Sequence, residues 1–390
     1  MRTSVALGGT LALVLLGLAC GSRSSAPGIT TATVTVTTAA ATTTAAPTTT
    51  AAPPPATLAR PFDPLSFTAV APDTFWLLGA TPCGAAMCAA IAHTTDGGGH
   101  FTGVHAPPAP IDLSGDTADA IDTLRFATDE TGFAFDEPSF HSGANPSAPI
   151  WETTDDGAHW QKLAFDDVRG VATGAGNLYL LRAACTATGC RGVTLERRPL
   201  AGGAWSSTPL GVRNVDPLMD LVAHGNALWV SVSGRDQPLQ TLRRSTDGGA
   251  TFTTAKSPCT NGLGGDLEPT SASVVWAVCP TGMLAVAARR TDGGVTWHTL
   301  TVGRELANAA RVAPASDTTA VLATGDQSEL LRTTDGGVTW SRVHPVEAGF
   351  WEFVGFTDAT TGTALRSAGQ RLVVLRSADG GTTWAPLRVG

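Results

Sequence analysis

The sequence predicts an all-β fold, a seven-bladed β-propeller, and two observations carry that prediction. One eight-residue motif recurs seven times along the 390-residue chain at nearly constant spacing. Between the copies, short apolar runs alternate with turn residues, four runs to a repeat, and helical periodicity is not found. Four strands in each repeat of about 45 residues are typical of propeller blades, which close into a ring.

The motif is clearest at residues 333–340, with the sequence TTDGGVTW. Asp335 is placed to accept hydrogen bonds from backbone N–H groups ahead of it, and the two glycines after it can adopt positive φ. Thr339 and Trp340 are expected to begin a strand whose indole packs against a neighbouring layer. We therefore interpret the motif as a structural turn with an aromatic wedge.

Copies of the motif measure the repeat. They stand at positions 96, 155, 201, 247, 292, 335 and 379, and the long first step reflects insertions in the second repeat. Six copies carry the aspartate: Asp96, Asp155, Asp247, Asp292, Asp335 and Asp379. Five end in tryptophan: Trp160, Trp205, Trp297, Trp340 and Trp384. Because the copy at 201 survives without its aspartate, we expect these carboxylates to be structural rather than catalytic or metal-binding.

Residues 1–20 read as a signal peptide. A short positive start precedes an apolar run at 5–19, which is too short for a comfortable transmembrane helix. The run ends in Leu16-Gly17-Leu18-Ala19-Cys20. This ending resembles the lipobox of bacterial lipoproteins, which implies lipidation of Cys20, although Gly17 departs from the usual aliphatic residue. The alternative is an ordinary cleaved signal peptide and a secreted protein.

Residues 21–59 are almost wholly Ala, Thr, Pro and Ser. Such a segment buries too little apolar surface to offset its ordering entropy, so we expect a disordered stalk. Residues 60–390 form the folded head. Together, anchor and stalk predict an exported protein at the bacterial cell surface or the outer face of the cytoplasmic membrane.

The motif resembles the Asp-box, or bacterial neuraminidase repeat. Residues 127–134, ATDETGFA, precede a copy in a way that is similar to propellers related to photosystem II assembly factors. The resemblance covers the head and implies that each motif is the turn between the third and fourth strands of a blade. It leaves activity open, because such propellers include enzymes, assembly factors and binding heads.

The six cysteines of the head fall into three pairs. They are Cys83 with Cys88, Cys185 with Cys190, and Cys259 with Cys279. If the motif marks one face of the ring, all three pairs belong to loops of the other face, where disulfides are plausible in an exported protein. Long loops on that face carry Asp136, Glu137 and His141, which we expect to contribute to a binding surface.

The resemblance and the carboxylates suggest two enzymatic activities. A sialidase needs a tyrosine nucleophile, and the single tyrosine, Tyr179, lies in an apolar run where a packed core residue is expected. A glycosidase with two carboxylates stays open, since Glu268 and Glu352 could face the central funnel. The histidines in or beside motif copies, such as His100 and His159, are expected to pack.

The composition of the chain excludes some classes of binding partner. The net charge is −8 and lysine occurs only at 162 and 256, so nucleic acid is not expected, and a membrane is expected to hold the chain through the lipid anchor alone. Neither a metal nor another cofactor is implied by any motif. We expect a monomer that binds a protein or glycan of the cell envelope without catalysis, with a carbohydrate-active hydrolase as the alternative.

Overall fold

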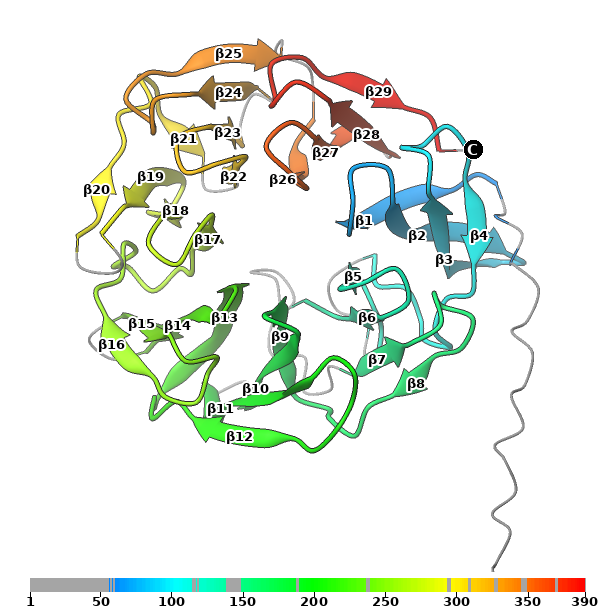
Figure 1. Cartoon of the computed structure of the whole chain (residues 1–390), viewed down its shortest axis with the longest axis horizontal. Helices are drawn as coiled ribbons and strands as arrows, with labels where there is room; N and C mark the ends of the chain where they lie inside the picture. The colour runs from blue at the N-terminus through cyan, green and yellow to red at the C-terminus, as the bar shows by residue number, and fades with distance from the viewer. Residues whose placement is uncertain are drawn as a thin grey trace, which may run out of the picture. The chain divides into compact units, whose positions relative to one another are not determined.

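A computed structural model describes residues 56, 58, 60–113, 117, 119–137, 149–186, 189–235, 239–292, 296–307, 310–325, 329–344, 349–368 and 371–389. The chain divides into two compact units, 1–50 and 51–390, and only the second contains described residues. The predicted signal peptide, Cys20 and nearly all of the predicted stalk lie outside them. Among the described residues every regular element is a β-strand (Figure 1), and no helix there could span a membrane.

The strands fall into seven sets of four consecutive strands, which we call modules. Module 1 contains β1 (Asp63–Ala69), β2 (Phe75–Cys83), β3 (Ala86–Thr94) and β4 (Thr102–Val104). Module 2 contains β5 (Thr123–Phe126), β6 (Gly132–Phe135), β7 (Ile150–Thr153) and β8 (Gln161–Lys162). Module 3 contains β9 (Val168–Gly174), β10 (Asn177–Thr186), β11 (Gly189–Pro199) and β12 (Ser206–Pro209).

The later modules repeat this plan. Module 4 contains β13 (Val215–His224), β14 (Ala227–Gly234), β15 (Gln240–Ser245) and β16 (Thr253–Ala255). Module 5 contains β17 (Asp266–Pro269), β18 (Val275–Pro280), β19 (Leu284–Arg290) and β20 (His298–Thr299), and β21 (Leu306–Ala307) also pairs with β19. Module 6 contains β22 (Arg311–Pro314), β23 (Ala320–Ala323), β24 (Leu330–Thr333) and β25 (Ser341–His344). Module 7 contains β26 (Trp351–Phe356), β27 (Gly362–Ala368), β28 (Arg371–Ser377) and β29 (Ala385–Leu387).

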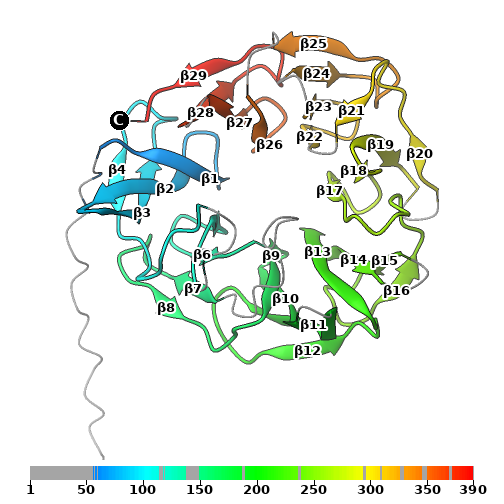
Figure 2. The same ribbon diagram turned by 180° about the vertical axis from the view of Figure 1, so that it is seen from behind.

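Each module is an antiparallel sheet in sequence order, and the sheets of the second unit surround a common centre. In Figures 1 and 2 the first strand of each module lies nearest that centre and the fourth lies outermost. Modules 3 and 4 share one eight-stranded sheet, because Cys190 of β11 pairs with Val215 of β13. Among the described residues no strand is exchanged between module 1 and module 7, which agrees with the contiguous runs in the sequence.

Strand direction defines two faces. Because neighbouring strands are antiparallel, the turn after a module's first strand and the motif turn after its third strand lie on the same side. In module 1 the Gly97 N–H of the motif turn donates to the Asp73 carbonyl of the first turn, at 2.9 Å. We call this side the motif face. The turns between second and third strands, and the connections between modules, lie on the opposite face.

The apolar core is divided among the joints between modules, and each joint holds one cluster of buried side chains. The aromatic residue that ends each motif copy packs into the cluster shared with the preceding module. These residues are Phe101, Trp160, Trp205, Phe252, Trp297, Trp340 and Trp384. The predicted aromatic wedge is therefore present, and it packs between modules. One detail differs: β25 begins at Ser341, so Trp340 precedes its strand.

One sequence position also connects every module to the next. It lies immediately before the first residue of each motif copy, and its side chain bonds to the following module. The pairs are His93 with Asp156, Glu152 with Arg198, Arg197 with Gly248, Arg244 with Ala272, Arg289 with Asp317, Arg332 with Gly380, and Arg376 with Pro72. The last pair joins module 7 to module 1 and so closes the ring.

Ring closure depends on side chains. The Arg376 guanidinium lies 4.6 Å from the ring centroid of Phe75 in module 1. Phe67 of module 1 lies 5.7 Å from Phe353 of module 7, centroid to centroid, within the same apolar cluster. Leu58 packs against this cluster and Ala56 pairs with Gly103, so contacts of the head begin a few residues before position 60.

Candidate functional site

The motif aspartates are fully engaged in their own turns. Asp335 accepts hydrogen bonds from the N–H groups of Val338 and Thr339, at 3.0 and 2.9 Å, and from the Thr339 hydroxyl at 2.6 Å. Thr333 donates to the same carboxylate and accepts from the Gly337 N–H. These hydrogen bonds, led by that of the Thr339 side chain, lower the pKa of Asp335 to about 2.

In the other copies, the side chain that bonds the second carboxylate oxygen of the aspartate varies. Asp247 and Asp379 accept from threonine hydroxyls, and the same cause lowers each pKa to about 2. Asp96 and Asp155 instead meet a histidine Nδ1 at 2.6 Å. The expectation that these histidines pack was wrong, because the His100 side chain is 92% exposed. It replaces the threonine hydroxyl as a hydrogen-bonding partner.

The fifth copy departs further. Asp292 still accepts from the Thr296 N–H at 2.9 Å. The position that holds Ser or Thr in the other aspartate-bearing copies is Arg290, which is fully buried. Its guanidinium lies 5.1 Å from the Trp297 ring centroid and 5.9 Å from that of Trp229. Burial lowers the pKa of Arg290 to about 10. Arg290 thus forms a cation–π contact with Trp297, the last residue of this motif copy.

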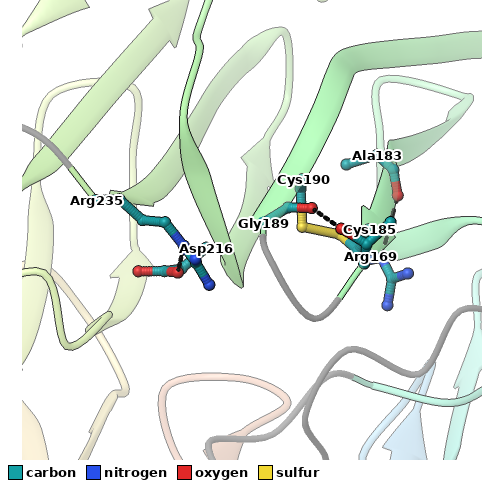
Figure 3. Close-up of a disulfide and its surroundings, with 8 residues drawn as sticks. Arg169, Ala183, Cys185, Gly189, Cys190, Asp216 and Arg235 are labelled. Atoms are coloured by element: carbon teal, nitrogen blue, oxygen red, sulfur yellow. Dashed lines mark hydrogen bonds and ion pairs between the residues drawn. A yellow bond between two sulfur atoms is a disulfide. The ribbon is translucent and has the colours of Figure 1, made fainter.

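All three predicted disulfides are present, and they belong to the opposite face. Figure 3 shows the one at the tip of the β10–β11 hairpin, between Cys185 and Cys190. Next to it, Arg235 forms an ion pair with Asp216 at 2.6 Å in module 4. The tip of module 3 is joined to module 4 where Cys190 pairs with Val215.

Charged side chains from the first strands of several modules interact near the centre of the ring (Figure 1). Arg125 of β5 pairs with Glu137, at 3.5 Å, and both side chains are 47% exposed. Asp122 accepts hydrogen bonds from the Glu137 N–H and the Thr123 hydroxyl, each at 2.8 Å. Burial nevertheless raises the pKa of Asp122 to about 7, with Asp136 and Glu137 adding to the rise.

Three more carboxyls approach from modules 4 and 5. Asp220 lies on β13, and Asp266 and Glu268 lie on β17. Burial, together with the charges of Asp266 and Glu137, raises the pKa of Asp220 to about 8. Burial together with Asp266 and Asp220 holds the pKa of Glu268 well above its usual range. Side chains of separate modules thus act on one another across the centre.

We call this set the axial cluster. Its members are Asp122, Arg125, Glu137, Asp220, Asp266, Glu268 and Arg311, the last of which favours the charged form of Asp266. Five carboxyls therefore face two guanidinium groups, and the mutual repulsion of the carboxyls is incompletely neutralised.

The predicted site residues divide between this cluster and other places. Glu137 and Glu268 belong to it, and Asp136 is buried beside Glu137 and acts on Asp122. Glu352 is exposed on β26, and among the described residues Glu268 interacts with the axial cluster rather than with Glu352. His141 lies outside the described residues.

Asp220, Asp266, Arg125 and Arg311 were missed in the sequence. Each lies on the first strand of a module. A search for charged residues in the first run of each repeat, which the propeller prediction places nearest the axis, would have found them.

The exposed large apolar side chains are unevenly distributed. Seven occur among the described residues. Six belong to turns, connections or strand ends of the opposite face: Met87, Leu113, Met283, Leu284, Val286 and Phe350. The seventh, Val338, lies in a motif turn. Met87 also lines a pocket of about 570 Å³ on the opposite face, with Ile91, Val104 and His105.

The geometry bears on two kinds of chemistry, a tyrosine nucleophile and a bound metal ion. Tyr179 is fully buried in the core, so it is not placed to act as a nucleophile. Within the described ranges, no group of three or more His, Cys, Asp or Glu side chains is arranged to hold a metal ion.

Comparison with known proteins addresses the fold. The chain matches no protein-family model and no curated protein. An inactive variant of virginiamycin B lyase from Staphylococcus aureus superposes with a TM-score of 0.55 at 15% identity, over 83% of this chain and 98% of that one. A streptogramin B lyase gives 0.52 at 14% identity, over 82% and 95%. Both are β-propellers. The head is a β-propeller.

YCF48 from Cyanidioschyzon merolae, another propeller, gives a TM-score of 0.45 at 14% identity, over 68% of this chain and 85% of that one. At identities of 14–15% such likeness shows the propeller fold alone.

Proposed function

We propose that this propeller is a non-catalytic binding module of the bacterial cell envelope, and that it recognises a protein or a glycan through the face opposite the motif turns. One observation carries the proposal: of the seven exposed large apolar side chains among the described residues, six belong to that face. Apolar groups gathered on one side of a protein commonly mark an interaction site.

The construction of the opposite face supports this role. Three disulfides fasten its turns and connections, and the Cys185–Cys190 tip is also joined to the next module. Rigid loops on a stable scaffold lose little entropy on binding. The motif face, by contrast, holds the hydrogen-bonded turns and the side chains that connect the modules.

The finer architecture belongs to the same proposal. We take each module as one blade and each motif as an Asp-box, which makes a seven-bladed Asp-box propeller. The seven joint clusters and the connecting side chain of every module support that count. A cleaved signal peptide, a lipid on Cys20 and the stalk would hold the head, as a monomer, at the cell surface.

The test is cross-linking on intact cells. A photo-reactive amino acid replaces Met283 in one variant and Val338 in a matched control, since both side chains are highly exposed and they lie on opposite faces. We expect a specific protein or glycan adduct with the first variant only. Equal labelling by both variants, or no adduct at any opposite-face position, would refute the proposal.

A second candidate function is a glycoside hydrolase, and the raised pKa values favour it. A general acid needs a raised pKa; burial and neighbouring carboxylates raise the pKa of Asp220 to about 8 and hold that of Glu268 well above its usual range. Turnover on a glycoside panel, with loss of about 10²-fold or more in Glu268→Gln, would establish this alternative. Absence of turnover at every pH tested would favour binding.

A further inference from the structure

We propose that the disulfide between Cys83 and Cys88 exchanges with an external dithiol, so that this turn of the opposite face is a redox site as well as a cross-link. The reactant would be a protein or small molecule with two thiol groups, which converts the disulfide into two cysteine thiols. This inference goes beyond the proposed binding role and does not depend on it.

Solvent reaches this disulfide and is largely excluded from the other two. Cys83 and Cys88 are both exposed, at the turn between β2 and β3. The four other cysteines of the head are buried, with exposed fractions of 2–7%. An attacking thiolate has to reach a sulfur atom of the bond, so access determines which disulfide reacts. Exposed disulfides are also in general the more easily reduced ones.

The fold of this hairpin does not depend on the sulfur–sulfur bond. β2 and β3 pair over nine consecutive residues, up to Cys83 and Ala86 beside the turn, with no shift of register. The other disulfides have further structural roles. Cys190 also pairs with a strand of the next module, and Cys259 with Cys279 fastens a connection between modules to β18. Reduction at the β2–β3 turn can therefore proceed in the folded head.

A buried hydroxyl group lies beside Cys88. Thr81 is directly opposite Cys88 in the ladder, so the two side chains project to the same side of the sheet, with Cβ atoms about 5 Å apart. Thr81 is 7% exposed, and its hydroxyl has no hydrogen-bond partner among the described residues. It can donate a hydrogen bond to a Cys88 thiolate and so stabilise the charged form. Cys88 is therefore the sulfur that leaves.

Cys88 also has free volume beside it. With Met87, Ile91 and Val104 it lines the pocket of about 570 Å³ on the opposite face, and Thr81 belongs to the same lining. When the disulfide opens, the Cys88 side chain can change rotamer into this space. The oxidised and reduced states can thus interconvert without a rearrangement of the core.

The exchange transfers two electrons. A thiolate of the dithiol attacks Sγ of Cys83, and the Cys83–Cys88 bond breaks with its electron pair on Sγ of Cys88. The second thiolate of the dithiol then attacks the dithiol's own sulfur in the mixed disulfide and releases Cys83 as a thiolate. The dithiol loses two electrons and two protons, and the two cysteines take up the protons and become thiols.

The experiment uses the purified chain and dithiothreitol, at neutral pH without denaturant. Thiols formed at successive times are alkylated and located by peptide mass spectrometry. Cys83 and Cys88 should become thiols at least about tenfold faster than the cysteines of the other two disulfides, with the circular dichroism spectrum unchanged. Reduction no faster than that of the other disulfides, or only together with unfolding, would overturn the proposal.

A monothiol shows which sulfur is attacked. Brief treatment with glutathione, followed by alkylation, should leave glutathione on Cys83 and the alkyl group on Cys88. Glutathione mainly on Cys88 would overturn the assignment of the leaving group.

Thr81→Val tests the hydroxyl group. It should slow reduction by dithiothreitol about threefold or more, as expected for loss of one hydrogen bond, and Thr81→Ser should restore the rate. Thr324→Val is the matched control. It removes a buried, unpartnered hydroxyl at the same end of the second strand of module 6, where Glu329 is opposite instead of a cysteine. An unchanged rate in Thr81→Val, or equal slowing by Thr324→Val, would overturn the role of Thr81.

Discussion

Two sets of aspartates in this chain have pKa values displaced in opposite directions. In the motif turns, backbone and hydroxyl donors stabilise the carboxylate, so the pKa falls. In the axial cluster, burial and like charges destabilise it, so the pKa rises. Carboxyls of the first kind stabilise the folded state, whereas carboxyls of the second kind reduce its stability. Such destabilising carboxyls are typical of functional sites.

Asp220→Asn should stabilise the head at high pH. The pKa of Asp220 is raised by folding, so its contribution to stability is full at low pH and is lost as the pH rises toward about 8. Asparagine removes the charge and with it this loss. Urea unfolding at pH 9 should show a gain of about 1–2 kcal/mol, with little difference at pH 4.

Glu352→Gln is the control, since it neutralises an exposed carboxyl on another inner strand. It should change stability little at either pH. A stability of Asp220→Asn equal to that of the unaltered chain at pH 9 would contradict the displaced pKa.

Among the elements, the module joint is the unit of stability. Each joint combines an apolar cluster, a motif aromatic residue and the side chain that precedes the motif. The joint between modules 7 and 1 has these parts without any covalent connection. It is therefore the place where the ring is expected to open first.

Arg376→Ala tests the closing joint. Loss of its hydrogen bond to Pro72 and its contact with Phe75 should cost about 1–3 kcal/mol. Hydrogen exchange should quicken in β1 and β28, because both flank the opened joint. Arg332→Ala is the matched control: it removes the same kind of bond between modules 6 and 7, which the chain still connects. Equal exchange patterns in the two variants would argue against a weak seam.

Disulfides should differ in their value to the fold. Cys259 and Cys279 are 20 residues apart, whereas Cys83 and Cys88 are 5 apart. Replacing the first pair by serine should therefore cost more, about 3 kcal/mol against about 2 kcal/mol, because it releases a longer loop in the unfolded chain. Chemical unfolding of both double variants provides the measurement. A larger loss of unfolding free energy on removal of the Cys83–Cys88 disulfide would indicate that native contacts of that turn, rather than chain entropy, determine its stabilising effect.

Elements were more predictable than the site. Motif spacing gave the repeat, and turn chemistry placed the third strand, as at Leu330 to Thr333, because both signals are local. Two of the disulfides, Cys83–Cys88 and Cys185–Cys190, could be paired because they occupy equivalent positions in different repeats. The axial cluster could not be predicted as a set, since Glu137, Asp220 and Glu268 meet only after three modules have closed around one centre. Glu268 was found and Asp220 was not, because each residue alone is an ordinary carboxylate in a strand.

For the molecule as a whole, the two sets of carboxyls predict a pH at which the stability of the fold is highest. The motif carboxylates, with pKa values lowered by folding, contribute stability above their ordinary pKa and lose it as the pH falls toward about 2. The axial carboxyls lose stability as the pH rises toward about 8. The melting temperature should therefore be highest at mildly acidic pH, about 4–6. A maximum above pH 8 would contradict this balance.

The anchor is tested on cells. Cys20→Ser should release the chain from the membrane fraction into the medium or the soluble envelope fraction, because the acceptor of the lipid is lost. Fractionation and immunoblotting measure the distribution, and Ser22→Ala serves as a neighbouring control that keeps the cysteine. Retention of the Cys20→Ser chain in membranes would refute lipidation at this site.

Closure of the ring through side-chain contacts, without a strand shared between modules 7 and 1 among the described residues, has a consequence for circular permutation. Leu58 and Leu387 pack in the same cluster, so both ends of the described head lie at one joint. All other joints differ from this one mainly in having a peptide connection across them. A short linker between the two ends, with a cut in any other connection on the opposite face, should yield a circular permutant with the same ring. The N-terminus of the head can thus be moved to any module, whereas the loops that each module places on the opposite face cannot be exchanged.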